Sequence, residues 1–86
     1  MRILELKDIN REDVAIYYRR TFTAKAVVEI PASSFEIPIS FTIETGPLGN
    51  KEFILDAFKS NDYPIIPLRK AILQFITTMD AEGKLP

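Results

Sequence analysis

The 86-residue chain contains no cysteine, no histidine and no tryptophan. Without an imidazole or a thiolate it lacks the side chains that most often act as general base or nucleophile, or that bind zinc, iron–sulfur clusters and haem. The 12 acidic residues show no pair whose spacing indicates two carboxylates held together for acid–base work. We therefore predict that the protein is not an enzyme and has no catalytic, cofactor-binding or metal-binding residues.

The chain also lacks long apolar runs and an excess of charge of either sign. No window approaches the roughly 20 apolar residues that cross a bilayer, and charged residues interrupt the first 13 positions, where a secretion signal needs an apolar core. The absence of cysteine agrees with a reducing compartment. We expect a cytoplasmic protein that does not bind membranes. The net charge of -1 leaves nucleic-acid binding to a local basic patch.

No repeat, low-complexity run or Gly/Ser tract divides the sequence, so we expect one domain over residues 1–86. Area scaling for a chain of 9.8 kDa predicts that apolar burial and conformational entropy nearly cancel. Association with a second copy would widen so narrow a margin. We therefore expect self-association, in the form of a homodimer.

The clearest alternation of apolar and polar residues runs from Phe35 to Glu44 and predicts a strand with one wet face. Pro38 cannot donate a ladder hydrogen bond, which favours an edge position or a bulge there. Upstream, Ala15–Ile30 is rich in β-branched and aromatic residues and predicts a long strand that contains a bend or bulge. Arg20 interrupts its apolar parity. A helix over Arg11–Arg20 is the alternative for the first part of this segment.

The remaining segments complete the predicted fold. The first nine residues suggest a short strand with Leu4 and Leu6 on one face, and residues 46–50 form a turn before a strand over 51–59 that is apolar on both faces. A helix is predicted over residues 67–81, because apolar residues recur there at i, i+3, i+4 and i+7; they are Leu68, Ala71, Ile72, Phe75, Ile76 and Met79.

Asp80 is placed on the wet face of this helix, and Gly83 is suited to the position just after its end. The order ββββα predicts an α+β protein, in which an antiparallel four-stranded meander is covered on one face by the C-terminal helix.

One face of the Ala15–Ile30 segment interleaves aromatic residues and cations, a pattern that would offer stacking surfaces beside phosphate ligands. This candidate nucleic-acid face comprises Tyr17, Arg19, Thr21, Thr23 and Lys25. The alternative is a solvated strand face whose cations protect an edge from pairing with other chains. The string Gly46-Pro47-Leu48-Gly49 has the spacing of the nucleotide-clamping loop of KH domains, but it lies between two predicted strands and is interpreted as a hairpin turn.

A second candidate surface is apolar. Only one helix is available to cover a sheet whose last strand is apolar on both sides, so the other face needs a cover. The candidate dimer face comprises Val27, Ile54, Phe58 and Leu73. A two-fold partner would cover it; the alternative is that loops or the first strand cover it within the monomer.

The segments Arg19-Arg20-Thr21-Phe22 and Phe41-Thr42-Ile43-Glu44, followed by a terminal helix, resemble the organisation of PUR-repeat proteins. The ββββα order is also similar to that of PC4-type coactivators. The resemblance implies dimerisation and binding of single-stranded nucleic acid. The residues themselves favour a small non-catalytic interaction domain that self-associates through its sheet and has a protein partner, with a weak single-stranded nucleic-acid-binding module as the alternative.

Overall fold

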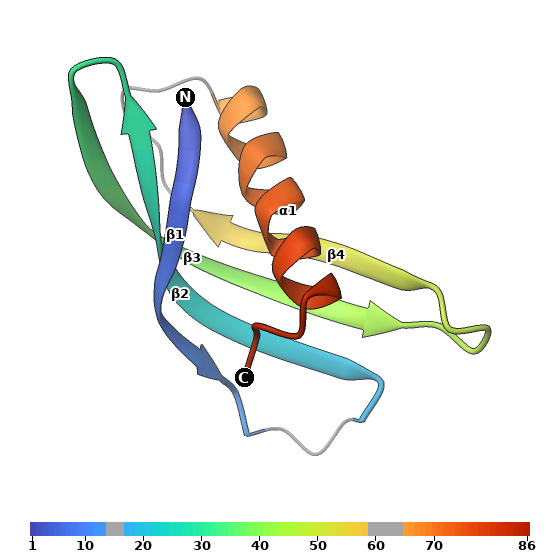
Figure 1. Ribbon diagram of the computed structural model, residues 1–86. Coiled ribbons are helices and arrows are strands. Elements are labelled where there is room, and N and C mark those ends of the chain that lie inside the picture. The colour runs from blue at the N-terminus through green and yellow to red at the C-terminus, as the bar shows by residue number, and fades with distance from the viewer. Residues whose placement is uncertain (14–16, 59–64) are drawn as a thin grey trace.

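The computed structural model describes residues 1–13, 17–58 and 65–86, with the backbone alone for residues 57 and 58. Its elements are the strands β1 (Arg2–Arg11), β2 (Arg19–Ile30), β3 (Ser33–Thr45) and β4 (Lys51–Phe58) and the helix α1 (Ile65–Ala81). The strands form an antiparallel sheet in the order β1-β2-β3-β4 (Figure 1). The α+β fold with ββββα order, predicted from the periodicity, is confirmed.

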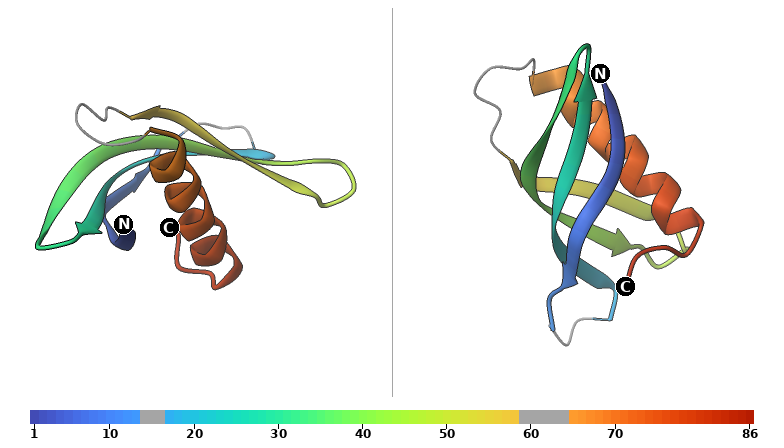
Figure 2. Two further views of the ribbon diagram at one scale, coloured as in Figure 1. Left: turned by 90° about the horizontal axis from the view of Figure 1, so that it is seen from above. Right: turned by 60° about the vertical axis from the view of Figure 1, so that its left-hand side comes forward.

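The sheet arches over α1, which lies on its concave side (Figure 2). The alternating apolar residues of β2 and β3 face this side, and the rings of Phe22 and Phe41 stack there with centroids 5.0 Å apart. From α1, the fully buried residues are Leu68, Ile72 and Ile76, one turn apart. Phe75 and Met79, which the spacing also assigns to the core, are only partly buried at its margin.

Two short turns connect the long strands. Ile30 pairs with Ser33, so the β2–β3 turn consists of Pro31 and Ala32. Ala32 has a φ of 71°, a left-handed conformation that glycine adopts more easily. At the other end of β3, Gly49 has a φ of 86° in the β3–β4 turn, which confirms the expected hairpin at residues 46–50.

The helix ends where Gly83 was expected to end it. Gly83 has a φ of 68°, its N–H donates to the carbonyl of Asp80 at 3.1 Å, and the N–H of Lys84 donates to the carbonyl of Met79 at 2.9 Å. This is the Schellman arrangement, which satisfies carbonyls that the last turn leaves free.

The second strand begins later than its composition predicts. β2 starts at Arg19, and Tyr17 and Tyr18 form a turn before it; residues 14–16 lie outside the described part of the chain. The alternative helix over Arg11–Arg20 is also wrong in the described residues, because Arg11 ends β1 and pairs with Phe22. Side chains of β-branched type favoured a strand correctly, but composition alone does not reveal where pairing begins.

The first strand carries two irregularities that change which side chains it buries. Ile3 pairs with Val28 and Glu5 with Val27, which leaves Leu4 as an extra residue. As a result Ile3 and Leu6 are buried whereas Leu4 is exposed, so the expectation that Leu4 and Leu6 share a face is wrong. The second irregularity, between Lys7 and Asn10, contains Asp8 at a φ of 51°.

β3 is interior along one half and an edge along the other. Its pairing with β4 begins at Ile39, whereas its pairing with β2 extends back to Ser33. Pro38 therefore lies one residue before the doubly paired part, where a missing N–H costs no hydrogen bond to β4. β4 is an edge strand with Phe53 and Leu55 in the core, and only half-burial of Ile54 corresponds to the second apolar face that was expected.

The fold leaves much of its surface open. The accessible surface is 5762 Å², against about 5,200 Å² for a typical monomer of this mass. The radius of gyration is 13.2 Å, against about 12 Å for a compact domain of this length. The excess follows from the architecture, since one helix covers only the concave face of a long, curved sheet.

Candidate interaction sites

The predicted nucleic-acid residues are divided between the convex face of the sheet and the turn before it. Thr21, Thr23 and Lys25 alternate along β2 with the buried residues of the core, and Arg19 begins the strand. Tyr17 lies in the turn before β2 and is 96% exposed. The five residues therefore do not form one continuous strand face.

The cations of the convex face are each matched by a carboxylate. Arg19 Nε lies 3.5 Å from Glu44 Oε1, and Lys25 Nζ lies 3.5 Å from Asp8 Oδ2. Lys7 donates to Glu36 at 3.0 Å, and this hydrogen bond raises the pKa of the lysine. The face therefore carries little uncompensated positive charge for a phosphate backbone.

A row of hydroxyls crosses the same face. The Thr21 and Thr42 hydroxyls are 3.2 Å apart, and Thr42 donates to Asp56 Oδ2 at 2.7 Å. Asp56 is the extra residue of a bulge, since Leu55 and Ala57 pair with the adjacent residues Phe41 and Ser40 of β3. The bulge explains how an acidic residue is accommodated in a strand that looks buried from its sequence.

Arg20, which interrupts the apolar parity of β2, belongs to a charge cluster on the helix side of the sheet. Its Nη2 lies 3.0 Å from Asp80 Oδ1, and Lys51 Nζ lies 2.7 Å from Asp80 Oδ2. The Asp80 side chain is only 7% exposed, which corrects its assignment to the wet face of the helix. Burial works to raise the pKa of Asp80, but the hydrogen bonds from Lys51 and Arg20 outweigh it and lower the pKa below its ordinary value.

The candidate dimer residues do not form one patch. Val27 pairs with Glu36 and Ile54 pairs with Thr42, six positions away along β3, or about 20 Å. Leu73 is on α1, partly buried against the core on the other side of the sheet. The side chain of Phe58 lies outside the described part of the chain. The apolar surface expected from β-strand parity is therefore not continuous.

The most exposed aromatic residues gather at one end of the sheet. Tyr17 and Tyr18, the latter 51% exposed, contact each other edge to face with ring centroids 5.9 Å apart and an interplanar angle of 88°. They border a surface pocket of about 750 Å³. We call this the tyrosine pocket; its lining residues are Tyr17, Tyr18, Glu44, Thr45, Gly46, Pro47, Asn50 and Glu52.

Backbone hydrogen bonds fix the walls of the tyrosine pocket. The N–H of Thr45 donates to the carbonyl of Tyr18 at 2.8 Å, which ties the turn before β2 to the end of β3. The N–H of Gly46 donates to the carbonyl of Asn50 at 2.7 Å. A Cβ at position 46 would lie 2.6 Å from Asn50 Oδ1, so this glycine is required for the close approach of the two sides of the hairpin.

Two carboxylates stand on the wall of the pocket. Glu44 and Glu52 are direct partners in the β3–β4 ladder, so their side chains lie next to each other on one face. Sequence reasoning found Tyr17 but assigned it to a strand face, and it missed Tyr18, Glu52 and the hairpin. The usable signal was the pair of adjacent tyrosines followed downstream by a Gly/Pro turn between two glutamates, but only the β3–β4 register joins these segments.

Comparison with known proteins places the chain in a family. The model of the BB-0187 family matches residues 1–81. The chain belongs to this family. The matched range contains all four strands and α1, so the family relation covers the whole fold described above. No curated protein and no solved structure matches the chain.

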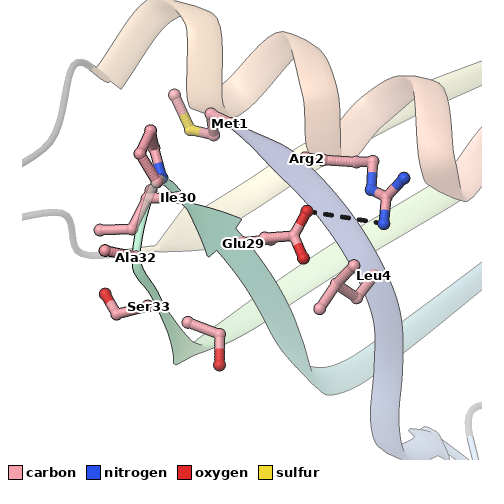
Figure 3. A pocket seen from close by; sticks show the side chains of 9 residues that line it. Met1, Arg2, Leu4, Glu29, Ile30, Ala32 and Ser33 are labelled. Carbon is pink, nitrogen blue, oxygen red and sulfur yellow. Dashed lines mark ion pairs between the residues drawn. The ribbon is translucent and has the colours of Figure 1, made fainter.

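This family member has a second pocket at the opposite end of the β2–β3 hairpin (Figure 3). It has a volume of about 630 Å³ and is lined mainly by small or aliphatic side chains, among them Met1, Leu4 and Ile30. Its charged residues, Arg2 and Glu29, are paired with each other at 3.5 Å. With its charges paired and no aromatic ring in its lining, this pocket indicates no particular ligand.

In the described parts of this family member, no group of three or more Asp or Glu residues is arranged to hold a metal ion. Its one helix in those parts is not long and apolar enough to cross a membrane.

Proposed function

We propose that this protein is a non-catalytic interaction domain whose protein partner docks at the tyrosine pocket. The observation that carries the proposal is the exposure of Tyr17 and Tyr18 beside a preformed concavity. Tyrosine is enriched at the energetic centres of interfaces, because its ring offers a large contact area and its hydroxyl keeps a hydrogen bond.

The setting of the two rings also suits docking. Tyr18 is anchored through its carbonyl to Thr45, and the facing hairpin is closed by the hydrogen bond between Gly46 and Asn50. A surface with a fixed backbone loses little conformational entropy when a partner binds. Leu48, at the tip of the same hairpin, is 95% exposed and extends the apolar surface available near the pocket.

Site-specific photo-crosslinking tests this proposal without assuming what the partner is. A benzoyl-phenylalanine placed at position 17 is expected to crosslink to a discrete protein in cells of the native host. The same group at position 5, on the opposite edge strand, serves as the matched control because Glu5 is also exposed. Equal crosslinking at both positions, or none at position 17, would show that the tyrosine pocket is not a docking site.

Self-association through the sheet is a second proposal, supported by the accessible surface of 5762 Å² and by the helix-free convex face. Because Val27 and Ile54 are separated along β3, such a dimer would need a surface wider than these residues. Sedimentation equilibrium over a range of concentrations is the test. A single species of monomer mass at ~100 μM, with an unfolding midpoint independent of concentration, would rule it out.

Binding of single-stranded nucleic acid is supported by one observation, the exposed Tyr17 ring two residues before the cation Arg19. A base could stack on the ring. With Arg19 and Lys25 already paired to carboxylates, binding would be weak and would decrease steeply with salt. Titration of a labelled oligonucleotide at low salt measures it, and an unchanged affinity in the Arg19→Glu, Lys25→Glu double variant would exclude this face.

A further inference from the structure

We propose that the tyrosine pocket recognises a cationic side chain, arginine or lysine, in an extended basic segment of the protein partner. The inference rests on the proposed function, since it specifies the chemistry of the partner that docks there. Two independent features support it: an unbalanced pair of carboxylates and a pair of exposed aromatic rings, both in the lining of one pocket.

The first feature is electrostatic. Glu44 and Glu52 are directly opposite each other in the β3–β4 ladder, where two like charges are destabilising. Arg19 Nε, 3.5 Å from Glu44 Oε1, offsets one of the two charges. Glu52 has no ion pair within residues 1–13, 17–58 and 65–86. A cation in the pocket would therefore relieve a repulsion that the isolated chain leaves in place.

The cations near the pocket are already engaged. Lys51 precedes Glu52 in β4, but its ammonium group is 2.7 Å from Asp80 Oδ2 on the helix side of the sheet. Arg19 is held by Glu44. The pocket thus retains net negative charge, which attracts a basic segment and repels a phosphate backbone.

The second feature is aromatic. The rings of Tyr17 and Tyr18 are nearly perpendicular, an arrangement in which the edge of one ring meets the face of the other and further ring surface remains uncovered. Tyr17 is 96% exposed, so a guanidinium or ammonium group can approach a ring face. Such a cation–π contact adds to the attraction of the carboxylates, and the volume of about 750 Å³ is ample for an arginine side chain.

The test uses three fluorescein-labelled Gly/Ser peptides that are identical except for two central residues, which are arginine, leucine or glutamate. Fluorescence anisotropy at low salt is expected to show binding of the arginine peptide at least about tenfold tighter than that of the other two, weakening as salt screens the charges. Tyr17→Ala is expected to weaken it by about threefold to thirtyfold. Glu52→Gln is expected to weaken it by about twofold to fivefold, and Glu52→Lys by more.

Two variants serve as matched controls. Leu48→Ser removes an equally exposed apolar side chain from the same hairpin, and Glu5→Lys makes the same charge change on the opposite edge strand. Both are expected to bind the arginine peptide with wild-type affinity. Circular dichroism of each variant checks that the fold is kept, and Tyr17 and Glu52 are exposed enough for this to be expected.

Three results would overturn the inference. Equal binding of the leucine peptide would show an apolar site without charge preference, and the proposed function would stand. Tighter binding of an oligothymidine that is strengthened by Glu52→Lys would show that the pocket favours anions. If no peptide binds at ~1 mM, cation recognition is wrong, and the photo-crosslinking experiment, which assumes no ligand chemistry, decides the proposed function separately.

Discussion

The Asp80 cluster provides the sharpest test of how the helix is fastened to the sheet. Asp80 lies in the last turn of α1, where the helix dipole disfavours negative charge. Its two carboxylate oxygens are bound by Arg20 of β2 at 3.0 Å and Lys51 of β4 at 2.7 Å. The cluster therefore joins the end of the helix to two strands that are not neighbours in the sheet.

Replacing Asp80 by Asn keeps the size of the side chain and removes its charge. A charge-assisted hydrogen bond contributes about 1.5–3 kcal/mol. We apply this range to Arg20, whose side chain is 23% exposed, but Lys51 is 40% exposed, so its pair is discounted to about 0.5 kcal/mol. After allowance for the desolvation of Asp80, we expect Asp80→Asn to cost about 2 kcal/mol at neutral pH, which lowers the melting temperature by roughly 8–16 °C.

The effect has a defined pH dependence. Because the pKa of Asp80 is lower in the folded protein than in the unfolded chain, the carboxylate stabilises the fold fully above its ordinary pKa of about 3.9. This contribution is lost as the pH falls through the lower, folded-state pKa. The stability difference between wild type and Asp80→Asn should therefore be largest near neutral pH and shrink in strong acid.

Urea unfolding followed by circular dichroism, at pH 7 and at about pH 2, measures both quantities. Asp8→Asn is the matched control, because the Asp8 pair with Lys25 is 3.5 Å long and exposed and should change stability by less than about 0.5 kcal/mol. Equal midpoints for wild type and Asp80→Asn at pH 7 would refute the fastening role. A deficit that persists undiminished in acid would refute its electrostatic origin.

Three further predictions can be checked by the same unfolding assay. Ile72→Ala should cost about 2–5 kcal/mol because Ile72 is fully buried, and Phe75→Ala should cost less because Phe75 is only partly buried; the reverse order would place the helix differently. Ala32→Gly should stabilise by about 0.5 kcal/mol, since glycine relieves the left-handed φ of 71° at some entropic cost, and a loss of stability would contradict this. Thr42→Val should cost about 1 kcal/mol because Asp56 loses its hydroxyl donor; Thr42→Ser should recover most of it, and a neutral Thr42→Val would show that water replaces the bond.

Local chemistry determined the element order of this protein. The period-2 pattern of Phe35–Glu44 specified β3, the i, i+3, i+4 pattern after Pro67 specified α1, and Gly83 specified where that helix ends. These features follow from the spacing of apolar side chains and from the conformational freedom of single residues, both of which are properties of a few neighbouring positions. They were therefore readable without any knowledge of long-range contacts.

Strand register was decided by the tertiary structure. The extra residues Leu4 in β1 and Asp56 in β4 shift the alternation of their strands, and a shift of one residue moves every following side chain to the other face. Parity counted along the sequence therefore assigned Leu4 to the core wrongly. It also suggested a continuous apolar patch from Val27 and Ile54, which the register places far apart.

The charge cluster and the tyrosine pocket depend on tertiary structure for the same reason. Arg20 interrupts a strand pattern until α1 brings Asp80 to within 3.0 Å of it, 60 residues along the chain. Tyr17 and Tyr18 border a pocket only because the meander places the start of β2 beside the β3–β4 hairpin. The sequence by itself determined which residues form strands, turns and helix. Which distant side chains meet was decided by the register and curvature of the sheet, because these set the distances across which charges and rings interact.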